Sequence, residues 1–148
     1  MSYFIRYILV RDETTLATID AALHLIDPDF NIQVDQSEVE TGDLYYKSEI
    51  LGEITVNRPG DSIFEEEIAE LRKQLDAVSH PDKPLVQTAL DVARAMVALH
   101  VLQAGNDNPD ILEQLWDWLF EQYPGVLQVD EEGYYDIDGL FLPTTPDE

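Results

Sequence analysis

The chain contains no basic residue after Arg94. Its last 54 residues include twelve Asp and Glu residues, so this segment has a formal charge of −12. The first 94 residues include nineteen acidic residues and all eight basic residues, which gives −11. The net negative charge per residue is therefore about twice as high in the carboxyl-terminal segment. This self-repulsion opposes compact folding, so any fold must be held together by a sufficient apolar core.

The net charge of −23 also limits the kinds of partner. Nucleic acids and anionic membrane surfaces are themselves negatively charged, so we predict no direct binding of nucleic acid and no membrane binding. A basic protein, by contrast, would be attracted over a long range. The charge therefore favours a basic protein partner.

An apolar fraction of 45% in 148 residues is enough for one hydrophobic core, which excludes a wholly disordered chain. We predict one domain over residues 1–142 and a loose tail over residues 143–148. The chain has no Cys, so disulfides, thiolate metal sites and cysteine nucleophiles are excluded. Arg6 interrupts the apolar amino terminus, which therefore predicts a strand rather than a signal peptide, and a cytoplasmic location is expected.

The first half of the chain alternates between strand and helix patterns. Tyr3–Val10 is almost continuously apolar and predicts a strand. Thr14 or Thr15 can cap a helix that follows, whose apolar side chains recur every three or four positions. These side chains are Leu16, Ile19, Leu23 and Ile26. Further strands are predicted at Ile32–Val34, Leu44–Lys47 and Ile50–Val56, the last two joined through Ser48 and Glu49.

Helix patterns dominate the next part of the chain. Ser62 and Glu65 form a capping box in front of an apolar stripe at helical spacing. The stripe consists of Phe64, Ile68, Leu71, Leu75 and Val78. Leu85–Leu102 is apolar nearly all round, with its few polar residues on one side, and predicts a single central helix. Within it, His100 is interpreted as a core or capping residue, with an acid–base role as the alternative.

The last part of the chain predicts a helix and a hairpin. Asn108 and Pro109 are typical of a helix start, and this helix extends to about Gln122. Val126–Val129 and Tyr134–Ile137 are strand-like segments separated by an acidic turn. The element order resembles a split βαβ, ferredoxin-like arrangement with added helices. We therefore predict an α+β fold with a mainly antiparallel sheet covered by helices, two further helices and a terminal hairpin.

The candidate partner-binding residues lie in this last part of the chain. At about 100° per residue, four carboxylates form one stripe of the predicted helix. Trp116 and Phe120 lie at the edge of its apolar arc. Two interpretations stay open: both tryptophans, Trp116 and Trp118, belong to the core, or this flank is a surface left for a partner. The candidate set is Asp110, Glu113, Trp116, Asp117, Phe120, Glu121, Asp130, Glu131 and Glu132.

Catalytic motifs are missing from the sequence. None of the serines lies in a nucleophile-elbow context, and no clustered glycines could hold a phosphate, so no catalytic residue and no cofactor are predicted. Asp136 to Gly139 mimics the start of a calcium loop but lacks the later acidic ligands, so no metal site is predicted. A hydrolase that uses carboxylates alone is a minor alternative.

The leading hypothesis is a non-catalytic, acidic interaction or regulatory protein that binds a basic protein partner. One alternative is a dimeric or small-molecule-binding ferredoxin-like module, a homodimer formed through a sheet edge or a pocket near Tyr45, Tyr46 or His100. Another is an inhibitor or immunity-type protein of a nuclease, or a nucleic-acid mimic. The mimic is disfavoured because the acidic stripe has one charge every ~5 Å, whereas duplex DNA has one every ~1.7 Å.

Moderate salt should raise the melting temperature of this protein. Salt screens the mutual repulsion of surface carboxylates once the Debye length falls to about 10 Å or less. Differential scanning calorimetry at several NaCl concentrations and constant pH measures the effect. A fall of the melting temperature with salt would show that specific ion pairs outweigh the net repulsion.

Overall fold

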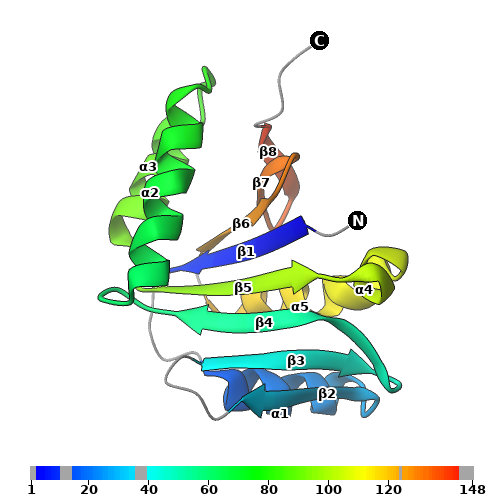
Figure 1. Ribbon diagram of the computed structural model, residues 1–148. Helices are drawn as coiled ribbons and strands as arrows, with labels where there is room; N and C mark the ends of the chain where they lie inside the picture. Colours follow the sequence, from blue (N-terminus) through cyan, green and yellow to red (C-terminus); the bar gives the residue numbers. More distant parts are fainter. Residues whose placement is uncertain (1–2, 11–14, 36–39, 124, 144–148) are drawn as a thin grey trace.

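The computed structural model describes residues 3–10, 15–35, 40–123 and 125–143. Its strands belong to a single sheet in the order β2-β3-β4-β5-β1-β6-β7-β8, and each neighbouring pair is antiparallel (Figure 1). The strands are β1 (Tyr3–Leu9), β2 (Phe30–Asp35), β3 (Glu40–Tyr46), β4 (Glu49–Asn57), β5 (Ala95–Val101), β6 (Gly125–Val129), β7 (Gly133–Asp136) and β8 (Gly139–Pro143). The helices are α1 (Leu16–Ile26), α2 (Ser62–Asp76), α3 (Lys83–Val92), α4 (Gln103–Asp107) and α5 (Pro109–Gln122).

The predicted α+β class with a mainly antiparallel sheet is confirmed. The near-continuous apolar sequence of β1 is explained by its central position, because helices cover both faces of the sheet there. Ile5, Tyr7 and Leu9 point to one core, and Ile8 points to a second core on the opposite face. The sheet therefore separates two layers of apolar packing.

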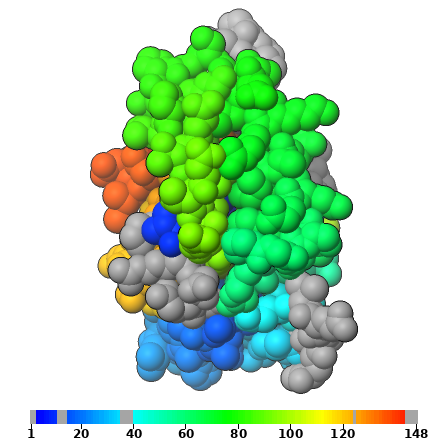
Figure 2. Space-filling model, turned by 90° about the vertical axis from the view of Figure 1, so that its left-hand side faces the viewer, coloured from blue at the N-terminus to red at the C-terminus, as the bar shows by residue number. Residues whose placement is uncertain are grey.

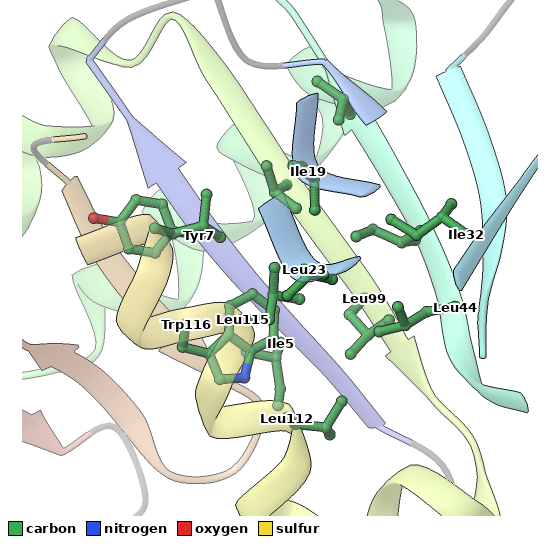
Figure 3. Close-up of a cluster of buried hydrophobic side chains, with 14 of the residues drawn as sticks. Ile5, Tyr7, Ile19, Leu23, Ile32, Leu44, Leu99, Leu112, Leu115 and Trp116 are labelled. Atoms are coloured by element: carbon green, nitrogen blue, oxygen red, sulfur yellow. The ribbon is translucent and has the colours of Figure 1, made fainter. Parts of the chain in front are cut away.

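The larger core lies between the sheet and the helices α1 and α5. Side chains from α5 meet those of β1 directly, with Leu112, Leu115 and Trp116 against Ile5 and Tyr7 (Figure 3). The α1 stripe was predicted correctly, since Leu16, Ile19 and Leu23 are buried, whereas Ile26 is 45% exposed. Thr15 is the N-cap, and its Oγ1 accepts the Thr18 N–H at 3.1 Å.

The second core lies beneath α2 and α3. Figure 2 shows these two helices side by side in the upper part of the view. Helix α1 appears lower in the same view, but it packs against the opposite face of the sheet. The predicted stripe of α2 is buried except for Val78, which is half-buried. The helix begins one residue earlier than the capping box implied, because Asp61 is the N-cap and its Oδ1 accepts the Ile63 N–H at 2.9 Å.

The prediction of one helix over Leu85–Leu102 is wrong. Helix α3 ends at Val92, and the chain then forms β5, which lies between β4 and β1. A strand that is buried on both faces is apolar at every position, so its sequence lacks the alternation that distinguishes a strand from a buried helix. Ala95 to Leu99 are all buried in this strand. His100 therefore lies on a strand and neither caps a helix nor belongs to the core.

Three smaller corrections concern turns and strand ends. Lys47 and Ser48, with φ of 51° and 72°, form the β3–β4 turn in place of Ser48 and Glu49. The terminal hairpin is extended by β8, which the sequence analysis missed, and Ile137 lies in the turn before it rather than in β7. Pro143 ends β8, and residues 144–148 of the predicted tail lie outside the described residues.

Helix α1 covers the outer edge of β2. Asp20 Oδ1 accepts the Ile32 N–H at 2.9 Å, and His24 Nδ1 lies 3.3 Å from the Phe30 carbonyl oxygen. The Phe30 N–H donates to the Asp27 carbonyl at 3.1 Å. Three outward-facing backbone groups at the Phe30 end of this edge strand therefore already have partners, which hinders pairing with another strand there.

Leu115→Ala should destabilise the fold by about 2–5 kcal/mol, because it removes a fully buried side chain and leaves a cavity between α5 and the sheet. Leu25→Ala is the matched control, since Leu25 is 87% exposed on α1 and should change stability by less than about 0.5 kcal/mol. Urea unfolding of both variants measures the difference. Equal losses would contradict this description of the core.

Candidate functional site

A groove of about 440 Å³ lies between α5 and the strands β6 and β7, on the face of the sheet that carries the larger core. Helix α5 forms one wall with the face that includes Glu113 and Asp117. The β7–β8 turn, residues 136–139, forms the opposite wall. In the chain, α5 and the β7–β8 turn are separated by β6 and β7. Pairing of β6 with β1, and of β7 with β6, places this part of the sheet beside α5 and so forms the groove.

Both walls of the groove are acidic. Glu113 and Asp117 lie one turn apart on α5, and Asp136 and Asp138 face them from the turn. Glu132 adds a fifth carboxylate at the end of the β6–β7 turn. Within the described part of the chain, no Lys or Arg lines this groove. Its electrostatic potential is therefore negative, and it favours a cationic occupant.

The floor of the groove is aromatic and apolar. Trp116 is only 5% exposed, so it belongs mainly to the core and also lines the groove at its base. Phe120 is half-buried and packs edge-on against Tyr7, with 5.0 Å between ring centroids. Trp118 is half-buried beside Tyr123 and does not line the groove. Most of the Trp116 side chain is therefore packed in the core, as the first of the two interpretations holds.

Two tyrosines at the groove stay protonated well above neutral pH. The Tyr135 hydroxyl donates to Glu132, and burial together with this carboxylate raises the pKa of Tyr135 to about 12. Burial and the charge of Glu132 also raise the pKa of Tyr3. Both side chains therefore offer neutral rings and hydroxyl groups to an occupant, and they add no further negative charge.

The structure brings together five of the nine predicted site residues in the groove. These are Glu113, Trp116, Asp117, Phe120 and Glu132. Asp110 and Glu121 are exposed on α5 but do not line it. Glu131 is exposed at the tip of the β6–β7 turn, where its φ of 68° lies in the region that favours glycine.

Asp130, the remaining predicted residue, is held by an internal ion pair. Arg6 Nη1 donates to Asp130 Oδ1 at 2.7 Å and to Gln128 Oε1 at 2.7 Å, and Arg6 Nε donates to Glu67 Oε1 at 2.9 Å. Burial lowers the pKa of the guanidinium, but the hydrogen bonds and charges of Asp130 and Glu67 outweigh burial and raise it above its usual value. Arg6 therefore stays charged and neutralises part of the β6–β7 turn.

A second hollow of about 740 Å³ lies on the other face of the sheet. It contains His100, whose ring stacks on Phe4 at 4.6 Å between centroids and whose Nδ1 lies 3.2 Å from Glu53 Oε1. Tyr3 and Glu132 line both hollows, so the two meet at the amino end of β1. Tyr45 and Tyr46, the other candidates for a ligand pocket, do not line this hollow.

The groove residues that the sequence analysis missed come from the β7–β8 turn and from the ends of strands. From the sequence, Asp136 and Asp138 belong to a segment that mimics the start of a calcium loop, for which no metal site is predicted. Asp136 Oδ1 accepts the Asp138 N–H at 2.8 Å, which is a turn interaction. The described residues include no group of three or more His, Asp or Glu side chains arranged to hold a metal ion. Recognition of β8 would have placed both aspartates opposite α5.

Comparison of this chain with family models, curated proteins and solved structures finds no match. Among the helices of the described residues, none is both long and apolar enough to cross a membrane.

Arg6→Met should destabilise the protein by on the order of 3 kcal/mol, because it leaves Asp130 and Glu67 without their cation in a poorly hydrated position. Arg72→Met is the control, since the Arg72–Asp91 pair is largely exposed and should contribute less than about 1 kcal/mol. Equilibrium urea unfolding near neutral pH measures both. Equal effects would show that the Arg6 network has no special role.

Proposed function

We propose that this protein is a non-catalytic interaction or regulatory protein that binds a basic protein partner in the groove between α5 and the β7–β8 turn. One observation carries the proposal: five carboxylates from three segments surround an aromatic floor that no described basic residue lines. Opposite walls of the same charge repel each other unless a cation lies between them. An arginine- or lysine-bearing surface supplies that cation.

The acidic walls and the apolar floor have different roles in this proposal. An exposed ion pair contributes only about 0.2–1 kcal/mol, so the carboxylates mainly raise the association rate and select a cationic partner. Most of the affinity comes from contact with the floor, where the half-buried Phe120 and Tyr135 offer large rings and Trp116 offers its small exposed part. The charge beyond the groove, −23 over the chain, extends the attraction to longer range.

The two edges of the sheet weigh against the alternative of a homodimer that forms by strand pairing. Asp20, His24 and Asp27 engage outer backbone groups of Phe30 and Ile32 in β2. At the other edge, β8 contains a register shift and ends at Pro143, which has no N–H to donate. Side-chain recognition in the groove therefore agrees better with the structure than β-sheet extension.

Neutralisation of the groove should weaken partner capture about tenfold, whereas the same charge change elsewhere on α5 should not. The groove variant is Glu113→Gln with Asp117→Asn. Its matched control is Asp110→Asn with Glu121→Gln, on the same helix but outside the groove. Each protein is used as bait in pull-downs from its native host at increasing salt. Equal capture by both double variants, or capture that does not weaken with salt, would overturn the proposal.

A further inference from the structure

We infer that the groove is shaped for a basic amphipathic helix of about three turns in the partner. This inference rests on the proposed function and specifies its occupant. Six α5 residues that line the groove recur at helical spacing from Pro109 to Phe120. They span about 16 Å of one helix face, the length of a three-turn helix laid alongside. A groove along one face of a helix is a common receptor for another helix.

The distribution of charge fits the cross-section of such a helix. Carboxylates lie on both walls, with Glu113 and Asp117 on α5 and with Asp136 and Asp138 on the β7–β8 turn. Apolar side chains, including Leu112 and Trp116, lie between these walls. A basic amphipathic helix has the complementary arrangement, an apolar stripe with Lys or Arg on each flank.

The volume of the groove indicates how deeply the occupant enters. About 440 Å³ is the size of a pocket for a small ligand, so it accommodates a few apolar anchor side chains. The backbone of the partner helix then stays at the rim, where the carboxylates can reach its cationic flanks. Ile137, which is 68% exposed on the β7–β8 turn, lies at that rim and offers apolar contact to the helix.

An extended segment fits the structure less well. A strand is usually bound by hydrogen bonds to a free sheet edge. The outer edge of β2 is occupied by α1, and β8 offers a short, shifted edge that ends in proline. The groove itself is bounded by α5 and by a turn, so it provides side chains rather than a backbone ladder.

Tryptophan fluorescence gives a direct test with synthetic peptides. The chain has two Trp residues, and Trp118→Phe leaves Trp116 in the groove as the single reporter. The probes are a 14-residue Leu/Lys peptide with helical periodicity and an isomer of identical composition in which Leu and Lys alternate. We expect the helical peptide to shift the Trp116 emission and to bind at least about tenfold more tightly than the isomer. Its far-UV circular dichroism should become helical on binding.

Charge variants in the same Trp118→Phe background separate this inference from the proposed function. Glu113→Gln with Asp117→Asn should weaken the helical peptide about tenfold, and Asp110→Asn with Glu121→Gln should leave its affinity within about twofold. Equal or tighter groove-dependent binding of the alternating isomer would overturn the helix inference and leave the proposed function standing. Failure of both peptides to bind would also overturn the helix inference. Binding that is equally insensitive to both double variants would overturn the inference and count against the groove as the partner site.

Discussion

The guanidinium of Arg6 connects the acidic carboxyl-terminal segment to the rest of the fold. No basic residue follows Arg94, so any cation that neutralises the carboxylates of that segment must come from earlier in the chain. Arg6 lies on the central strand β1 and binds Glu67 of α2 and Asp130 beside β6 at the same time. The central strand β1 thus carries a buried charge, and Asp130 and Glu67 compensate that burial.

Among the described carboxylates of the carboxyl-terminal segment, Arg6 pairs with Asp130 and not with those that line the groove. Asp130 lies on the face of the sheet where Arg6 points, whereas Glu113, Asp117, Asp136 and Asp138 surround the opposite face. Glu132 lies between the two faces and lines both hollows. The amino-terminal strand thus anchors the β6–β7 turn through Asp130. In the proposed function, the groove carboxylates that do not pair with Arg6 are the ones that meet the partner.

Much of the local structure could be predicted from the sequence, since α1, α2 and α5 have apolar residues at helical spacing and surface helices bury one face. The strand β5 could not be predicted in this way. Its residues are apolar on both faces because it lies between β4 and β1 beneath helices, and periodicity disappears at such a position. In the candidate site, Glu113, Trp116, Asp117 and Phe120 were found because a helix places them on adjoining faces, whereas Asp136 and Asp138 required the unpredicted strand β8.

Residue types alone establish that this protein is acidic, has enough apolar residues for a core and has a carboxyl-terminal segment without basic residues of its own. The regular rotation of a helix also locates the acidic and aromatic residues of α5 on its surface. The three-dimensional arrangement was needed to learn which carboxylates face each other, which one pairs with Arg6 and how α1 engages the edge of β2. The pairing of Arg6 with Asp130 joins segments more than 100 residues apart, through the β1–β6 register. That register is set by packing of the whole sheet rather than by local pattern.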